Sequence, residues 1–199
     1  IMASGDYYAN ITFNGNEEYP AVNYENVRFS LSINSFSNLY ALFIDSMIEH
    51  KDVVLNRDYI DDDEDFAFID EYFNLLEENA LAIDGKGHII DCGHVDNFLY
   101  IGPEWKVSIK NLIIINSNGA AIHNKGNLTV SNSTFHNNSA DDCGGAIYNC
   151  EGHVTIMGST FSLNNGYEGG AILNERSYLT IINSTFTGNK AEYGAAIYN

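Results

Sequence analysis

One six-residue block recurs four times in the C-terminal half of the chain: GAAIHN at 119–124, GGAIYN at 144–149, GGAILN at 169–174 and GAAIYN at 194–199. Each copy begins 25 residues after the previous one, at positions 119, 144, 169 and 194. A fixed period of this length is the sequence signature of a repeat architecture, in which one short unit stacks on the next. The block therefore predicts a solenoid with one coil per repeat.

Two further blocks keep the same phase. The first is an apolar-Thr-apolar tripeptide and the second is Ser-Thr-Phe. They begin at Leu128, Val154 and Leu179, and at Ser133, Ser159 and Ser184, respectively. Each block is short, rich in β-branched residues and bounded by Gly, Asn or Ser, which is typical of a strand between turns. We therefore expect three strands per coil, each parallel to its copy in the next coil at about 4.8 Å.

Equivalent side chains of successive coils should then stack. Buried apolar columns would stabilise the coil, since each such side chain contributes roughly 1.5 to 3 kcal/mol when fully buried. Asparagine amides at the strand ends would bond to their copies one coil away, forming ladders. The predicted columns are Ile122, Ile147, Ile172 and Ile197, and Phe135, Phe161 and Phe186. The predicted ladders are Asn124, Asn149 and Asn174, and Asn138, Asn164 and Asn189.

These features predict an all-β fold, a right-handed single-stranded parallel β-helix of the pectate-lyase type over residues 53–199. Ahead of it, residues 35–52 carry apolar side chains at helical spacing, with Ser37 as the expected N-cap. Those side chains are Leu39, Leu42, Phe43 and Met47. Such a helix would cover the open end of the first coil. Residues 1–34 are expected to form a separate β-rich segment. Because no comparable cap follows the last block, we expect this chain to be part of a longer array.

The chain carries 9 Lys and Arg against 27 Asp and Glu, a formal net charge of −18. A protein this acidic is repelled by phosphate backbones and anionic lipids, which argues against nucleic acid or membrane-surface partners. No stretch approaches the roughly 20 apolar residues that a membrane span needs. The three cysteines, Cys92, Cys143 and Cys150, lack CxxC spacing, so we interpret them as thiols and not as zinc ligands.

An enzyme is the main alternative, because this type of fold also supports polysaccharide lyases and glycoside hydrolases. Glycoside hydrolysis needs two carboxylates about 5 to 10 Å apart. The candidate pairs are Asp141 with Asp142, and Asp84 with Asp91. The first pair occurs in one coil only and the second flanks a glycine turn, so we interpret both as turn residues. The GHG and RxK motifs of pectin-cleaving hydrolases are absent from the sequence. No catalytic residue is therefore predicted.

Metal and modification sites give weaker signals. Five histidines lack metal-ligand spacing, namely His88, His94, His123, His136 and His153. The acidic run from Asp61 to Asp65 is a candidate for weak calcium binding, although we interpret it as a solvated insertion. No other cofactor is expected. N-x-Ser/Thr sequons suit a secreted protein, but Ser and Thr after Asn also match the strand-turn pattern. The sequons begin at Asn10, Asn127, Asn132, Asn137 and Asn183.

Five tyrosines are predicted to face outward from the coil: Tyr148, Tyr167, Tyr178, Tyr193 and Tyr198. Exposed aromatic side chains provide binding energy at interfaces. They could form a face that binds a sugar or a protein, or they could cover a flat sheet. The sequence does not decide between these two roles.

The paired GGAI and FxxN motifs, at 144–147 and 135–138 and again in the following coils, resemble the repeats of polymorphic outer-membrane proteins. SFSNL (35–39), LNRDY (55–59), IDGKGHIID (83–91) and VSIKNLIIIN (107–116) precede the blocks in an order similar to that of adhesin-like surface proteins of methanogenic archaea. The resemblance covers about residues 35–199. It implies an extracellular, cell-surface protein that attaches to glycans or proteins of other cells or surfaces, and it supplies no catalytic residues.

Overall fold

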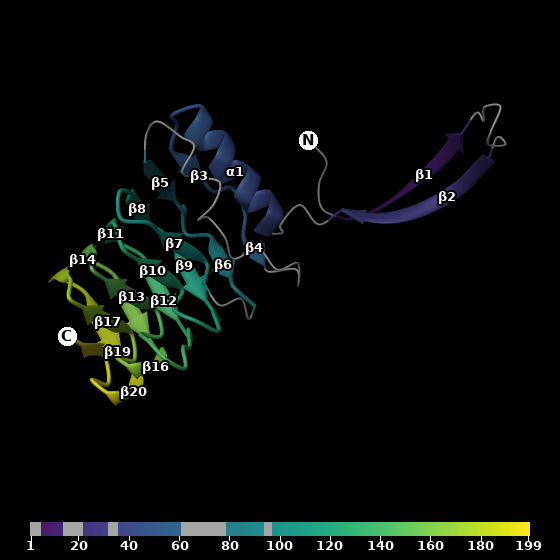
Figure 1. The fold of residues 1–199 in the computed structure, drawn as a ribbon. Coiled ribbons are helices and arrows are strands. Elements are labelled where there is room, and N and C mark those ends of the chain that lie inside the picture. The colour runs from purple at the N-terminus through teal and green to yellow at the C-terminus, as the bar shows by residue number, and fades with distance from the viewer. Residues whose placement is uncertain (1–4, 14–21, 32–35, 61–78, 94–96) are drawn as a thin grey trace.

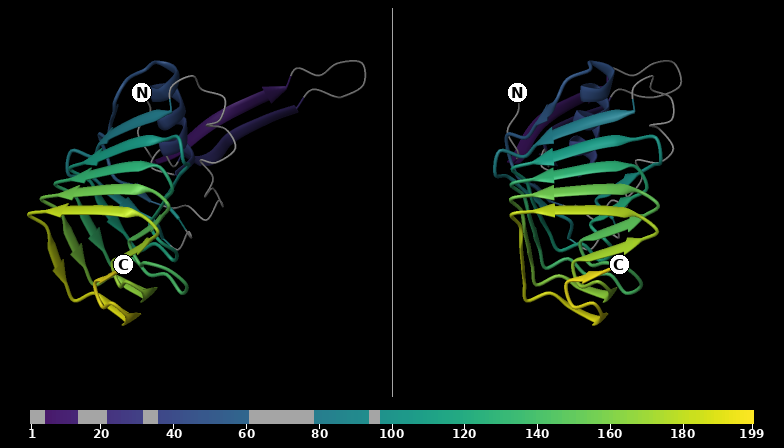
Figure 2. Two further views of the ribbon diagram at one scale, coloured as in Figure 1. Left: turned by 60° about the vertical axis from the view of Figure 1, so that its left-hand side comes forward. Right: turned by 90° about the vertical axis from the view of Figure 1, so that its left-hand side faces the viewer.

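The computed structural model describes residues 5–13, 22–31, 36–60, 79–93 and 97–199. Within these residues the chain winds into a parallel coil with three long sheets, and each coil after the first adds one strand to each sheet (Figures 1 and 2). We call the sheets face 1, face 2 and face 3 in the order in which the chain visits them. The predicted all-β parallel solenoid is confirmed.

Face 1 has six strands: β3 (Val53–Val54), β5 (Ala80–Asp84), β8 (Lys106–Lys110), β11 (Asn127–Ser131), β14 (His153–Met157) and β18 (Tyr178–Ile182). Face 2 also has six: β4 (Tyr59–Ile60), β6 (Ile89–Asp91), β9 (Ile113–Ile115), β12 (Thr134–His136), β15 (Thr160–Ser162) and β19 (Thr185–Thr187). Face 3 has five: β7 (Leu99–Ile101), β10 (Ile122–Asn124), β13 (Ile147–Cys150), β17 (Ile172–Glu175) and β21 (Ile197–Tyr198).

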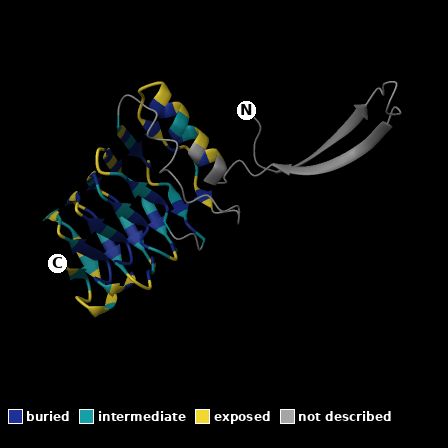
Figure 3. Ribbon diagram, viewed as in Figure 1, coloured by how far each residue is buried: buried dark blue, intermediate teal, exposed yellow. Residues whose placement is uncertain are grey.

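The core is the interior of the coil: along the strands, buried residues alternate with more exposed ones, and the buried ones are dark blue in Figure 3. Ile122, Ile147 and Ile172 pair in register across β10, β13 and β17 and are fully buried. The phenylalanine side chains of β12, β15 and β19 stack in the same way, with ring centroids 4.8 and 4.9 Å apart. The predicted columns therefore lie in line, and their members in the last coil, Ile197 and Phe186, are half-buried.

Asparagine ladders line two of the three corners. Between faces 3 and 1, Asn124 Nδ2 donates to Asn149 Oδ1 at 2.8 Å, and Asn149 Nδ2 donates to Asn174 Oδ1 at 2.7 Å. Between faces 2 and 3, Asn138 Nδ2 donates to Asn164 Oδ1 at 3.0 Å, and Asn164 continues to the next coil. Each amide bonds to its own copy one coil away, so the sequence period itself satisfies these buried polar groups.

A serine ladder lines the third corner, between faces 1 and 2, and was not predicted. The backbone N–H of Ser133 donates to Ser159 Oγ at 3.2 Å, and that of Ser159 donates to Ser184 Oγ at 3.1 Å. The residue before each serine has positive φ: 47° at Asn132, 56° at Gly158 and 47° at Asn183. Asn and Gly tolerate this left-handed conformation best, which explains why they alternate here.

Helix α1 (Phe36–Ile48) covers the first coil, with Leu39, Phe43 and Met47 buried against it. The rings of Phe43 and Phe98 meet edge to face at 6.2 Å. The helix is shorter than the predicted range of 35–52. It ends at Ile48, and the chain then turns through His50, with φ of 52°, into β3.

Ser37 lies inside α1, because the helix already begins at Phe36, so its prediction as N-cap is wrong. Ahead of α1, β1 (Gly5–Phe13) and β2 (Val22–Leu31) pair as an antiparallel hairpin. The acidic run from Asp61 to Asp65 lies outside the described residues.

A short fourth sheet was also not predicted. It consists of β16 (Asn165–Glu168) and β20 (Lys190–Tyr193), which pair in parallel on the long connection between faces 2 and 3. An isolated bridge between Ser139 and Asn165 extends this pairing toward the preceding coil. The two-coil sheet gives that connection a defined position beside face 3.

Candidate functional site

Face 3 carries aromatic side chains on its outer surface. In each of its strands the residue after the buried column points outward, because side chains alternate along a strand. Parallel pairing sets Tyr100 against His123 and His123 against Tyr148. Their ring centroids are 4.9 and 4.7 Å apart. Three half-buried rings in adjacent coils thus form one continuous row.

The row continues beyond a buried leucine. Leu173 follows Tyr148 in register, and Tyr198 follows Leu173. The ring of Tyr198 lies 6.3 Å from that of Tyr193 on the short sheet, and Tyr193 lies 5.8 Å from Tyr167. These last three tyrosines are 39%, 46% and 44% exposed, respectively. We call the whole set the aromatic strip: Tyr100, His123, Tyr148, Tyr198, Tyr193 and Tyr167.

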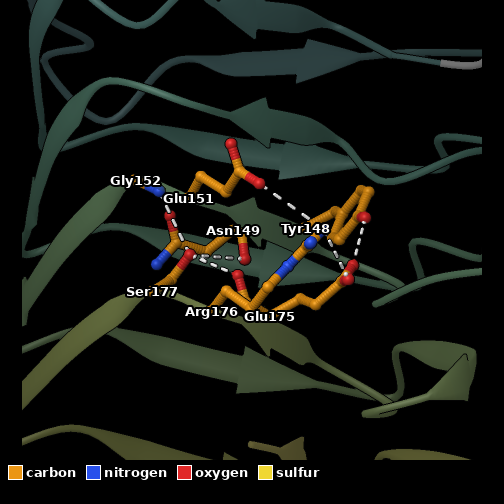
Figure 4. Close-up of polar contacts among 7 residues, drawn as sticks. All are labelled: Tyr148, Asn149, Glu151, Gly152, Glu175, Arg176 and Ser177. Carbon is orange, nitrogen blue, oxygen red and sulfur yellow. Dashed lines mark hydrogen bonds and ion pairs between the residues drawn. The ribbon is translucent and has the colours of Figure 1, made fainter.

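Charged groups border the strip at the corner between faces 3 and 1 (Figure 4). The Tyr148 hydroxyl donates to Glu175 Oε2 at 2.6 Å. Burial and this neighbouring carboxylate raise the pKa of Tyr148, so its hydroxyl stays a donor. Arg176 lies 3.0 Å from Glu175 and 3.5 Å from Glu151, and both carboxylates raise its pKa. Acceptors and a permanent cation therefore stand beside the rings.

The same corner holds these charged residues in place. Glu151 and Arg176 have φ of 61° and 49°, at equivalent positions of two coils. The Ser177 hydroxyl donates to the carbonyl of Glu175 at 2.7 Å and accepts from the N–H of Gly152 at 3.1 Å. The turn is thus fixed by bonds within and between coils.

At the other end of the strip, Lys125 Nζ lies 5.8 Å from the ring centroid of Tyr100, within the range of a cation–π contact.

Chemically, the strip is suited to binding. Its rings offer apolar faces, and its border offers carboxylate acceptors and a guanidinium donor. Both kinds of group match the C–H faces and hydroxyls of a sugar.

The structure divides the five tyrosines predicted to face outward. Tyr148, Tyr167, Tyr193 and Tyr198 lie in the strip, whereas Tyr178 lies on face 1, stacked on His153 with centroids 4.7 Å apart. The prediction that all five tyrosines share one face is therefore wrong. Tyr100 and His123 were missed. The signal for His123 was its place in the GAAIHN block, equivalent to Tyr148, while the coil of Tyr100 lacks a recognisable block.

The candidate catalytic carboxylates lie on a connection or at the ends of strands: Asp84 ends β5 and Asp91 ends β6. Asp141 and Asp142 are exposed on the connection between faces 2 and 3. Asp84 is buried, with its carboxylate 2.9 Å from Lys86 Nζ and 3.0 Å from Asn111 Nδ2, and these bonds hold its pKa well below the usual range. Asp91 accepts from the N–H of Gly93 at 3.1 Å. These contacts give Asp84 and Asp91 a structural role in the coil.

In the described part of the chain, the side chains do not assemble a metal site or a thiol-based catalytic site. There, no cluster of three or more His, Cys, Asp or Glu side chains is placed to hold a metal ion. His94 and the run from Asp61 to Asp65 lie outside it. Cys92, Cys143 and Cys150 are not joined to one another by disulfide bonds. No described helix has the length and apolar character to cross a bilayer.

A hollow of about 420 Å³ lies between the end of α1 and the outer surface of face 1. Its lining includes Met47, Lys51, Ala82, Lys106 and Asn127. Lys51 is paired with Glu49 at 2.7 Å. The only ring in this lining is the imidazole of His50, so the hollow lacks the row of stacked rings that the strip provides.

Residues 59–199 match the family model described as the right-handed β-helix region. The chain belongs to the right-handed β-helix family. The predicted handedness of the coil is thereby confirmed. The family includes enzymes as well as non-enzymes. Membership therefore defines the fold of this β-helix, whereas its function has to be inferred from the residues of its site. Neither a curated protein nor a solved structure matches the chain.

Proposed function

We propose that this β-helix is an extracellular attachment module, which binds glycans of another cell or surface through the aromatic strip. The observation that carries the proposal is the run of six aromatic residues along face 3 and the short sheet, with ring centroids 4.7 to 6.3 Å apart except across Leu173. Soluble monomers rarely expose a contiguous row of apolar side chains unless a partner covers it.

The physics favours a sugar as the partner. A pyranose ring can lay its C–H face on a tyrosine, and its hydroxyls can bond to Glu175 and Arg176 at the border. Because the rings already contact one another, they lose little conformational freedom when a ligand covers them. The rigid coil thus provides a preorganised surface.

The motif order shared with adhesin-like surface proteins supports the extracellular setting, as do the sequons. The net charge of −18 supports partners other than nucleic acids. We further propose that the protein is not an enzyme, since Asp84 and Asp91 are engaged in turn contacts.

A glycan array tests the proposal. The labelled wild-type protein is expected to bind a subset of glycans, and the triple variant Tyr167→Ala, Tyr193→Ala, Tyr198→Ala should bind those glycans at least about tenfold more weakly, a loss of about 1.4 kcal/mol. Tyr178→Ala is the matched control, because this tyrosine is 70% exposed but lies on face 1. Its binding should equal that of the wild type.

Binding to no glycan on the array would contradict the proposal, and so would equal losses in the triple variant and in Tyr178→Ala. Incubation with the same polysaccharides separates the enzymatic alternative. If the wild type releases reducing ends and an Asp141→Ala, Asp142→Ala variant does not, the protein is a polysaccharide-cleaving enzyme and the proposed attachment function is contradicted.

A further inference from the structure

Four sequons have described side chains, and the structure places them in different settings. Their acceptor asparagines are Asn127, Asn132, Asn137 and Asn183, followed at the second position by Thr129, Thr134, Ser139 and Thr185. The ladder asparagines are mostly buried and use their amides within the coil. A glycan needs an amide that is free to face solvent, so the setting of each sequon decides whether the folded coil accommodates it.

Asn132 and Asn183 occupy equivalent positions at the corner between faces 1 and 2. Both are exposed and both have φ of 47°. Within the described residues, neither side-chain amide has a hydrogen-bond partner. The corner is only two residues long, because β11 ends at Ser131 and β12 begins at Thr134. No connecting loop therefore shields either amide.

The acceptor asparagines of the other two sequons are exposed as well, but each lies against a neighbour that a glycan would disturb. Asn137 Nδ2 donates to Asn116 Oδ1 at 2.8 Å, so a glycan on this nitrogen would have to fit beside a bond between coils that already uses one of its two N–H groups. Asn127 lines the hollow beneath the end of α1. A glycan there would have to leave through that hollow, past Lys51 and Lys106.

The coil between the two open sites has no asparagine at the equivalent corner position. Gly158 takes the equivalent position, with φ of 56°, and is followed by Ser159 and Thr160. Asn132 Oδ1 lies 2.8 Å from where a Cβ on Gly158 would stand. The absent side chain leaves room beside Asn132, and two coils separate the open sites by about 10 Å.

We propose that Asn132 and Asn183 are N-glycosylated and that Asn127 and Asn137 are not. The donor is an oligosaccharide activated as a lipid-linked diphosphate. Transfer forms a bond between Nδ2 and the anomeric carbon, Nδ2 loses one proton, and the lipid diphosphate leaves. This corner joins faces 1 and 2, whereas the aromatic strip lies on face 3 and the short sheet, so both glycans would leave the strip bare. The proposal depends on export of the chain and not on what the strip binds.

Secretion of the full chain from a eukaryotic host tests this assignment. A tail carrying one added sequon is fused to the chain, and the host is chosen so that this reporter is occupied. Enzymatic deglycosylation in ¹⁸O-water then marks each occupied asparagine for peptide mass spectrometry. Label is expected at Asn132 and Asn183 and not at Asn127 or Asn137.

Two kinds of variant sharpen the result. Thr134→Ala and Thr185→Ala should each abolish label at one site while keeping the asparagine that the corner requires. In the Thr134→Ala background, where Asn132 carries no glycan, Gly158→Asn completes a sequon in the same conformation and should restore a second labelled site. An occupied reporter with unlabelled Asn132 and Asn183 would overturn the proposal, as would equal label at Asn127 or Asn137.

Discussion

The rings of Phe135 and Phe161 lie parallel in successive coils, with centroids 4.8 Å apart and an interplanar angle of 2°. Phe161 is fully buried and also stacks on Phe186 at 4.9 Å. Phe161→Ala would open a cavity in the middle of the column, and we expect a loss of about 3 to 5 kcal/mol in the free energy of unfolding. Urea titration measures it. Phe186→Ala should cost less, because that ring is half-buried. Equal stability of Phe161→Ala and the wild type would refute the buried column.

The ladder residue Asn164 makes the next prediction. Its Oδ1 accepts from the N–H and the Nδ2 of Asn138, both at 3.0 Å, and its Nδ2 donates to the carbonyl of Phe135 at 3.1 Å. Asn164→Ala would leave several buried groups unpaired, at about 1 to 3 kcal/mol each. The neighbouring Asn165→Ala is the control, since Asn165 is exposed and its amide makes only a 3.5 Å contact. If both variants unfold at the same urea concentration, the ladder contributes no stability.

These interior features were predictable because every coil imposes the same constraint on the same position. A residue such as Ile147 must match Ile122 and Ile172, so the pattern repeats in the sequence. The outer surface has no such constraint. His123 and Leu173 occupy the position that Tyr148 has in its coil, so this position repeats in the sequence but its residue type does not. Which face an outward tyrosine occupies depends on corner lengths, and that is why Tyr178 was grouped wrongly.

The buried carboxylate of Asp84 predicts a pH dependence. Its hydrogen bonds from Lys86 and Asn111 lower its pKa from the ordinary value of 3.8. A pKa that is lower in the folded state stabilises the protein above the unfolded value, and this contribution is lost as the pH falls through the folded value. Asp84→Asn should therefore reduce stability at pH 7, and its difference from the wild type should shrink below about pH 4.

Urea titrations of both proteins at pH 7 and pH 3 give this difference, and effects of other carboxylates cancel in it. Asp141→Asn serves as the control, because Asp141 is exposed on a connection. A difference for Asp84→Asn that grows on acidification would contradict the assignment.

The thiols predict slow alkylation of the native protein. Burial and the neighbouring Asp142 raise the pKa of Cys143 to about 12, and Cys92 and Cys150 are buried. Because the thiolate is the nucleophile, iodoacetamide at pH 8 should modify none of the three in the folded state and all three in denaturant. Intact-mass spectrometry over time distinguishes these outcomes. Rapid modification of Cys143 in the native protein would show that its corner is open.

The last prediction concerns why the repeat block begins with GG in two coils and with GA in the other two. A Cβ on Gly145 would lie 2.5 Å from the carbonyl oxygens of both Asn165 and Gly170. Asn165 begins β16, and Gly170 meets Lys190, the first residue of β20, in the same way. Ala120 takes the equivalent place in a coil whose successor has no strand of the short sheet in the described residues.

Glycine is therefore required where the short sheet approaches the block. Gly145→Ala should destabilise the protein by about 1 to 3 kcal/mol, since the backbone must shift to admit one methyl group. Gly102→Ala is the control, because its Cβ would meet only Trp105, at an ordinary contact distance of 3.4 Å. Thermal unfolding of the two variants compares the sites. A Gly145→Ala protein as stable as Gly102→Ala would mean that the short sheet does not press on this corner.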